Sequence, residues 1–259
     1  MESPVVLTIA GAVARLTLNR ADKHNAFDDE IIALLISKLE EVKTQNEVRV
    51  LVLQSTGKSF SAGADLNWMK RMATLSYEQN MDDARQLALL MHTLNTLPIP
   101  TIVKVQGASF GGAIGLISCC DIAIASDKAK FCLSEVKLGL SPATIGPYVV
   151  QAVGARRCRQ LFLTAELFNA EQAADWGLVH KLVASEQLEQ EVDSTINQIL
   201  QSGPSASKAT KTLIADIERG LDQPAEHTAE LIARLRVSEE GQAGLTAFFE
   251  KQSAPWIKQ

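Results

Sequence analysis

Phe60-Ser61-Ala62-Gly63-Ala64-Asp65 and Gly107-Ala108-Ser109-Phe110-Gly111-Gly112-Ala113 are two turns of one design. Each consists mostly of small residues, follows a β-rich run and precedes a helical pattern, so each predicts a strand, a tight turn and a helix start. Small residues let a ligand approach the backbone, and a helix start leaves N–H groups unpaired. If the turns converge, one N–H group from each forms an oxyanion hole. Tight packing alone also explains either turn, and neither matches a P-loop or G-x-G-x-x-G.

Strands and helices alternate on both sides of these turns. Residues 5–9 and 13–18 predict a hairpin, and Asp28 suits the cap of a first helix. Pro142 suits the first turn of a later helix that Gly154 ends. This alternation predicts an α/β fold whose last third is helical. Further predicted strands are residues 48–53, 101–105, 121–125, 131–133 and 178–183, and further helical patterns cover residues 81–94, 155–164, 170–176, 186–200 and 205–221.

The composition is that of an ordinary globular protein. Of 259 residues, 46% belong to the set AVILMFWYC and 21% are charged, and the formal net charge is −5. These values exclude disorder and argue against a dedicated nucleic-acid binder. No apolar run reaches the roughly 20 residues of a membrane span, and residues 1–4 lack the features of a signal peptide. The four cysteines form no C-x-x-C, and the four histidines have no metal-ligand spacing. We therefore expect a cytoplasmic protein with no metal and no membrane partner.

The order of these motifs resembles the enoyl-CoA hydratase/isomerase (crotonase) superfamily over essentially the whole chain. The resemblance implies a crotonase spiral of ββα units in residues 1–190, with the acyl-CoA site, and a C-terminal helical trimerisation region in residues 191–259. It implies a homo-oligomer, a trimer or a dimer of trimers, that acts on an acyl-CoA thioester without a separate cofactor. The matching residues are 19–20, 25–26, 61–65, 107–112, 120–125, 131, 135, 138–140, 142, 174, 176–179 and 247–251.

The resemblance also implies roles for individual residues. The backbone N–H groups of Ala64 and Gly112 are expected to hold the thioester oxygen. Phe248 and Lys251 match C-terminal positions that reach CoA bound to a neighbouring subunit. The other residues expected at the CoA moiety are Lys23, Ala62, Ala64, Asp65 and Leu66.

Glu135 is the expected acid and base. It lies among apolar neighbours in Phe131-Cys132-Leu133-Ser134-Glu135-Val136, which read as a strand. Desolvation there raises the pKa of a carboxyl group and suits it to proton transfer near neutral pH. A surface glutamate near Lys137 explains the local sequence equally well. The resemblance favours catalysis, because relatives carry a catalytic glutamate at this position.

Gly115 is the one departure from the pattern of the two-glutamate hydratases, which carry a second acid at this position. With one carboxylate, Glu135 performs both proton transfers, or Glu78, Asp82 or Asp83 supplies a second acid. A lone glutamate at position 135 is also what Δ3,Δ2-enoyl-CoA isomerases use, so isomerisation stays open. A catalytically weak acyl-CoA-binding protein is a third reading.

The segment that follows Glu135 favours hydration. Residues 133–149 resemble bacterial hydratases that act on 3-methylglutaconyl-CoA or γ-carboxygeranoyl-CoA (isohexenylglutaconyl-CoA), and Gly115 is similar to that subgroup too. We therefore expect an acyl-CoA hydratase that adds water across a 2-enoyl-CoA double bond.

Overall fold

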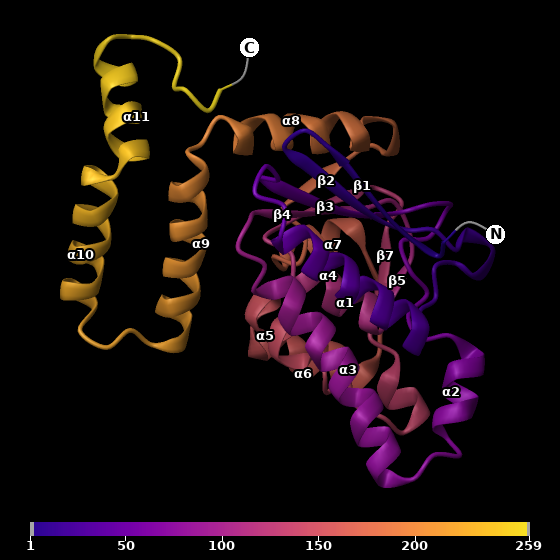
Figure 1. Cartoon of the computed structure of the whole chain (residues 1–259). Coiled ribbons are helices and arrows are strands. Elements are labelled where there is room, and N and C mark those ends of the chain that lie inside the picture. Colours follow the sequence, from indigo (N-terminus) through magenta and orange to yellow (C-terminus); the bar gives the residue numbers. More distant parts are fainter. Residues whose placement is uncertain (1–2, 258–259) are drawn as a thin grey trace.

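A twisted six-stranded sheet forms the centre of the molecule in the computed structural model, which describes residues 3–257 (Figure 1). The strand order is β1-β2-β3-β4-β6-β9; β1 and β2 form the expected antiparallel hairpin, and the other neighbours are parallel. Residues 1 and 2 of the amino-terminal segment considered above lie outside the described residues. The strands are β1 (Val5–Ala10), β2 (Val13–Leu18), β3 (Val50–Ser55), β4 (Thr101–Val105), β6 (Ile122–Ser126) and β9 (Lys181–Val183).

The central strands are buried on both faces. In β3, Leu51 and Leu53 point into the main core, whereas Val50 and Val52 point into a second, smaller core under a helix. Strands that are buried on both faces have continuous apolar sequences. This explains why residues 48–53 predicted a strand although apolar and polar residues do not alternate there.

A second sheet has three short strands in the order β5-β7-β8. They are β5 (Ser109–Phe110), β7 (Lys130–Cys132) and β8 (Phe168–Asn169). β5 lies inside the second small-residue turn, and β8 was not predicted. Each of these two strands has only two residues. They are strands because they pair with β7, and their own amino-acid composition gives no signal for them.

The helices cover the sheets in an arrangement close to the predicted one. Asp28 caps the first helix, as expected, by accepting a hydrogen bond from the Ile31 amide. The helix expected to begin near Pro142 begins instead at Gly146, and Pro147 occupies its first turn. The helices of the body are α1 (Asp29–Lys43), α2 (Leu66–Met72), α3 (Tyr77–Asn95), α4 (Gly112–Ser118), α5 (Gly146–Val153), α6 (Ala155–Thr164) and α7 (Ala170–Asp175), with short 3-10 helices η1 (Ala21–Lys23), η2 (Glu135–Leu138) and η3 (Ser185–Gln187).

Four helices end the chain: α8 (Leu188–Leu200), α9 (Pro204–Arg219), α10 (Pro224–Val237) and α11 (Glu239–Phe249). α8 lies across the larger sheet, where Leu188, Val192 and Ile196 complete the smaller core. α9, α10 and α11 project from the body (Figure 1). The division expected between residues 190 and 191 stays a prediction, and it falls inside α8.

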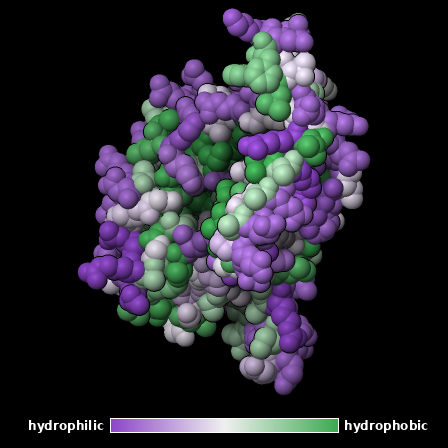
Figure 2. Space-filling view, turned by 90° about the vertical axis from the view of Figure 1, so that its left-hand side faces the viewer, coloured by the Kyte–Doolittle hydropathy of each residue, from purple (hydrophilic) through white to green (hydrophobic). Residues whose placement is uncertain are grey.

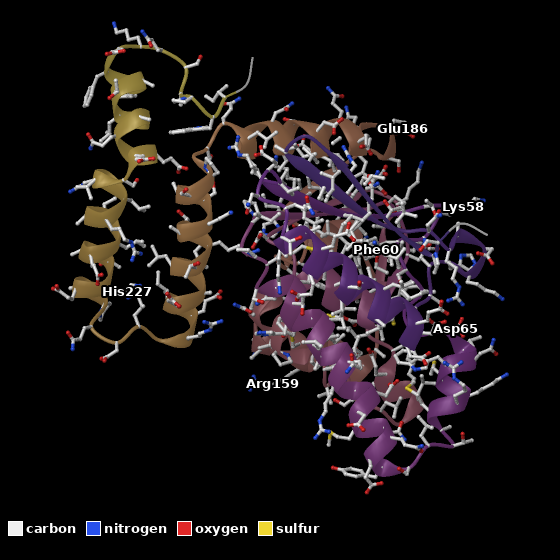
Figure 3. All side chains as sticks on the ribbon, viewed as in Figure 1. Lys58, Phe60, Asp65, Arg159, Glu186 and His227 are labelled. Carbon is white, nitrogen blue, oxygen red and sulfur yellow. The ribbon has the colours of Figure 1, made fainter. Side chains whose placement is uncertain are left out.

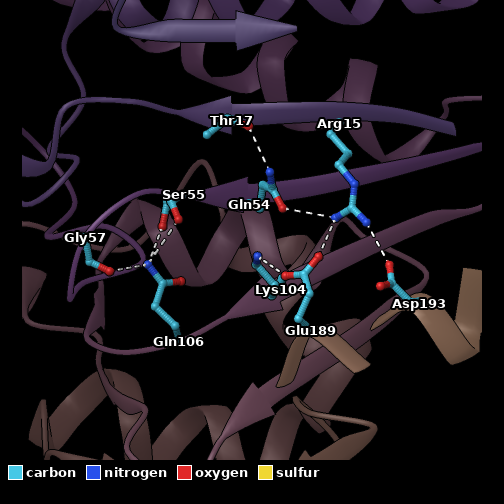
Figure 4. Close-up of polar contacts among 9 residues, drawn as sticks. All are labelled: Arg15, Thr17, Gln54, Ser55, Gly57, Lys104, Gln106, Glu189 and Asp193. Atoms are coloured by element: carbon cyan, nitrogen blue, oxygen red, sulfur yellow. Dashed lines mark hydrogen bonds and ion pairs between the residues drawn. The ribbon is translucent and has the colours of Figure 1, made fainter. Parts of the chain in front are cut away.

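Polar contacts also join α8 to the sheet (Figure 4). Arg15 of β2 pairs with Glu189 at 3.0 Å and with Asp193 at 2.8 Å, and Lys104 of β4 pairs with Glu189. Among residues 3–257, no helix is long and apolar enough to cross a membrane.

Candidate active site

The two small-residue turns lie side by side, as the oxyanion-hole reading requires. The Ser61 amide donates to the Ala108 carbonyl at 3.1 Å, and the Phe110 amide donates to the Ser61 carbonyl at 3.0 Å. Gly63 has φ +82°, and a Cβ atom there would lie 2.6 Å from the Phe110 carbonyl oxygen. Only glycine allows this approach of the two backbones.

One amide in each turn is unused. In the part of the chain that the structure describes, neither the Ala64 nor the Gly112 amide donates a hydrogen bond. Their neighbours are engaged, because the Asp65 amide donates to Phe27 and the Gly111 amide donates to Cys132, both at 2.9 Å. Two unpaired N–H groups on adjacent turns are suited to binding an anionic oxygen.

Phe27, which sequence reasoning did not single out, connects the two turns. Its amide donates to the Gly63 carbonyl at 2.9 Å, and its backbone forms a parallel bridge with Ala64. Its fully buried ring covers Gly112, where a Cβ atom would lie 2.6 Å from ring carbon Cζ. The signal in the sequence that could have indicated Phe27 is an aromatic residue directly before the helix cap Asp28. Phe27 therefore sets how close the two unused amides lie.

Asp65 shapes the first turn with its side chain (labelled in Figure 3). Oδ1 accepts the amides of Asn67 and Trp68 and so caps α2, while Oδ2 accepts Arg20 Nη2 at 2.6 Å. Burial acts to raise the pKa of Asp65, but these amides and the Arg20 guanidinium outweigh it and hold the pKa below its ordinary value. Both carboxylate oxygens are thus engaged inside the protein.

Glu135 is the first residue of η2, not part of a strand, which corrects the sequence-based expectation. β7 ends at Cys132, and the chain turns so that Oε1 of Glu135 lies 3.2 Å from where a Cβ atom on Gly111 would be. Glu135 therefore adjoins the turn that carries the Gly112 amide. The sequence could not show this, because the contact depends on the pairing of β5 with β7.

The Glu135 carboxyl group is half-buried and poorly satisfied. Its Oε2 is buried and has no hydrogen-bond partner among the described residues. Burial raises its pKa above the ordinary value, the predicted direction, against a smaller opposite effect of a backbone hydrogen bond. A carboxyl group with one unpartnered oxygen, next to the turn that carries the Gly112 amide, can exchange a proton with a bound molecule.

The space beside Gly115 is filled by Ile145. A Cβ atom on Gly115 would lie 2.3 Å from Cγ2 of Ile145 and 3.2 Å from Sδ of Met91. Ile145 is 1% exposed and directly precedes α5. Position 115 therefore has no room for a carboxylate side chain in this packing.

The three other candidate acids are engaged elsewhere. Glu78 accepts the Ser76 hydroxyl, and this contact with its backbone hydrogen bond lowers its pKa. Asp82 is exposed and pairs with Arg85. Asp83 accepts the Trp68 indole at 3.0 Å, and burial raises its pKa. No contact in the described chain joins any of them to Glu135.

The expected CoA-contacting residues fall into two groups. Lys23 lies near the first turn, because the Ala62 amide donates to His24 at 2.9 Å, and Leu66 next to that turn is 73% exposed. Phe248 and Lys251 are exposed at the end of α11, far from α2 within one chain (Figure 1). Residues 3–257 contain no group of three or more His, Cys, Asp or Glu side chains that could hold a metal ion.

Known proteins match this fold and the order of its motifs. The model of the enoyl-CoA hydratase/isomerase family matches residues 8–259, so the chain belongs to that family, and its α/β architecture is the crotonase fold. The crystal structure of an enoyl-CoA hydratase from Shewanella pealeana superimposes with a TM-score of 0.95 at 49% identity, covering 98% of this chain and 96% of that one.

Relatives of two activities are similar to the chain along nearly its whole length. A putative enoyl-CoA hydratase of Thermus thermophilus is 31% identical over 93% of this chain and 96% of the relative. A trans-2-decenoyl-[acyl-carrier-protein] isomerase of Streptococcus mutans is 30% identical over 96% of this chain and 95% of the relative. The family is thereby established, and an acyl-CoA thioester substrate is consistent with it.

Proposed function

We propose that this protein hydrates the double bond of a 2-enoyl-CoA thioester. The observation that carries the proposal is the half-buried carboxyl group of Glu135, whose Oε2 has no partner among the described residues, beside the second of two adjacent turns that carry the unused amides of Ala64 and Gly112. These are a proton carrier and an anion site, the two elements that the reaction needs. CoA arrives as part of the substrate, and the proposed chemistry uses no metal and no separate cofactor.

In the proposed steps, Glu135 first accepts a proton and later returns it. The Glu135 carboxylate takes a proton from water, and the oxygen of that water bonds to the β-carbon. The electron pair of the double bond moves to the thioester, whose oxygen becomes negative and is held by the amides of Ala64 and Gly112. Glu135 then returns its proton to the α-carbon. Atoms and charge balance, and the carboxylate is regenerated.

A single carboxylate is sufficient in this scheme. The water oxygen and the returning proton both come from the side of the acyl group that faces Glu135, so H and OH add to one face. The packing of Ile145 against Gly115 supports this reading, because it excludes a second acid at the position where two-glutamate relatives carry one.

For the acyl group, we propose 3-methylglutaconyl-CoA or γ-carboxygeranoyl-CoA. Support comes from residues 133–149, which resemble hydratases of this type. A distal carboxylate on the substrate needs a cation. Arg71 pairs with Asp29, whereas Lys70 is exposed on α2 and has no ion pair within the described residues, so Lys70 is the candidate. Turnover of these two thioesters against crotonyl-CoA tests the substrate class.

Isomerisation is the second candidate, because one base can also carry a proton between two carbons of an enoyl chain. Incubation of the purified protein with 2-enoyl-CoA and, separately, with 3-enoyl-CoA distinguishes the activities. A 3-hydroxyacyl-CoA product supports the proposal. Migration of the double bond without hydration identifies an isomerase, and binding without turnover identifies an acyl-CoA-binding protein.

We also propose that CoA meets Lys23, Ala62, Asp65 and Leu66 near the first turn, and Phe248 and Lys251 of a neighbouring copy. The basis is a homo-oligomer, a trimer or a dimer of trimers, formed through α9–α11. Their exposed apolar side chains include Ile214, Ile232 and Phe249. A cavity of about 770 Å³ lies between α9 and the body, and hydrophobic residues surround a hollow on that side of the molecule (Figure 2). The cytoplasmic location stays a prediction.

A further inference from the structure

Arg20 lies outside the proposed chemistry but joins the two helix caps that flank the first oxyanion turn. Its Nη1 donates to Asp28 Oδ2 at 2.9 Å, and its Nη2 donates to Asp65 Oδ2 at 2.6 Å. The three side chains are 23%, 18% and 10% exposed. Ion pairs this sheltered are screened less by solvent than surface pairs are.

Each aspartate divides its two oxygens between Arg20 and a helix. Asp28 Oδ1 accepts the Ile31 amide at the start of α1, and Asp65 Oδ1 accepts the Asn67 and Trp68 amides at the start of α2. The fork of a guanidinium group fixes two carboxylates at a defined separation and angle. Arg20 therefore sets the distance between the two helix starts.

The residues directly before these aspartates form the bridge of the site. Phe27 precedes Asp28, Ala64 precedes Asp65, and Phe27 and Ala64 pair as a parallel bridge. The Asp65 amide donates to the Phe27 carbonyl at 2.9 Å. Arg20 thus closes a ring of contacts around the Ala64 amide, and the Phe27 ring carries the same constraint to Gly112.

Arg20 is itself held in place from the other side. Its amide donates to Asn25 Oδ1 at 2.9 Å, and the Asn25 amide donates back to the Arg20 carbonyl at 2.9 Å. Asn25 is buried, and its Nδ2 donates to Thr56 and Ser59, which precede the first turn. Arg20 and its two aspartate partners, Asp28 and Asp65, form what we call the clamp. The clamp is therefore attached to the loop that leads into the first turn.

We propose that Arg20 is a positioning residue for the oxyanion hole: by pairing with Asp28 and Asp65 it holds the Ala64 and Gly112 amides at the separation that the thioester oxygen requires. This inference rests on the proposed function. A displacement of about 1 Å in a catalytic group can cost about 100-fold in rate. We expect Arg20→Lys, which keeps the charge and loses the fork, to lower kcat by about 10- to 100-fold with little change in KM.

Arg15→Lys is the matched control. Arg15 also pairs with two carboxylates, its side chain is 26% exposed, and it lies on the sheet beside α8 (Figure 4). A merely structural role for Arg20 predicts that both variants lose stability and neither changes kcat selectively. Asp65→Asn is a second variant that keeps a capping oxygen and loses the pair, so it tests the clamp if Arg20→Lys folds poorly.

The decisive readout is the carbonyl stretching frequency of bound butyryl-CoA carrying ¹³C at the thioester carbon, a probe that has no double bond to hydrate. We expect the wild type and Arg15→Lys to lower this frequency below its value in water, and Arg20→Lys and Asp65→Asn to lower it less. An unchanged frequency together with unchanged kcat in Arg20→Lys, or an equal loss in Arg15→Lys, overturns the inference.

A failure of the proposed function gives a different result. In that case the wild type hydrates no 2-enoyl-CoA, whether or not it shifts the carbonyl band. The ¹⁵N chemical shifts of Ala64 and Gly112 in the free protein then test the clamp alone. Shifts of both signals in Arg20→Lys, but not in Arg15→Lys, support positioning, and unmoved signals contradict it.

Discussion

At the scale of single residues, the burial that suits Glu135 to proton transfer also lowers the stability of the folded protein. Its buried Oε2 lacks a partner within residues 3–257, and burial raises the pKa of the carboxyl group. A group whose pKa is raised on folding stabilises the native state at low pH, where it is protonated in both states. That contribution is lost as pH rises through the folded-state pKa, because the native state then holds a desolvated charge.

We therefore expect Glu135→Gln to be more stable than the wild type at pH 7. This advantage should shrink as pH falls through the raised folded-state pKa of Glu135 and vanish below the ordinary pKa of glutamate. Glutamine has the same size and carries no charge to desolvate. Urea unfolding of both proteins from pH 4 to pH 8 measures the difference. A variant that is less stable than the wild type at pH 7 contradicts the burial of an unsatisfied carboxylate.

Residue types could be predicted from the sequence better than their surroundings. Small residues before helical patterns marked the turns that contain Ala64 and Gly112, and both turns lead into helices as expected. Three features of the site depend on contacts between distant segments. They are the absence of hydrogen-bond partners for the two amides and for Glu135 Oε2 among the described residues, and the packing of the Phe27 ring over Gly112. No local pattern encodes such contacts.

At the scale of elements, the packing of α4 against the start of α5 leaves no room for a carboxylate side chain at position 115. Gly115 lets the helices approach, and Ile145 fills the resulting space. The sequence showed that an acid was missing, but Ile145 lies thirty positions further along the chain. Its segment was read as helix from Pro142, whereas residues 141–146 form turns before α5.

This packing predicts coupled effects of substitutions at the two positions. Gly115→Ala forces a methyl group against Ile145 and should cost about 1–3 kcal/mol, and Ile145→Gly should cost about 2–5 kcal/mol through the cavity it leaves. The double variant should be less destabilised than the sum by at least about 1 kcal/mol. Denaturant unfolding of the four proteins gives this coupling energy, and strict additivity would show that the two positions do not share one space.

Element boundaries were predicted well where a local cap or breaker defines them. Asp28 and Gly154 mark helix ends that the structure reproduces. β5 and β8 were missed because tertiary pairing alone defines two-residue strands. Glu135 was placed in a strand because its apolar neighbours carry no helical signal over so short a stretch as η2.

At the scale of the whole molecule, the projecting helices α9–α11 expose large apolar side chains, which favours burial against another copy of the chain. Phe248 and Phe249 are 76% and 75% exposed. We expect light scattering to give a mass that is three or six times 28.1 kDa. Phe248→Asp with Phe249→Asp should lower that mass, because charged side chains oppose burial at an interface. A wild-type mass of 28.1 kDa contradicts the proposed assembly.

The central claim is that Glu135 alone moves the protons of hydration, and the turnover number of Glu135→Gln tests it most directly. The control is Asp83→Asn, because Asp83 is also a partly buried carboxylate whose pKa burial raises above its ordinary value. With the 2-enoyl-CoA that the wild type hydrates fastest, Glu135→Gln should lose at least about 100-fold in kcat while Asp83→Asn stays within a few-fold of the wild type. Hydration by Glu135→Gln at near the wild-type rate, or an equal loss in Asp83→Asn, would contradict the account.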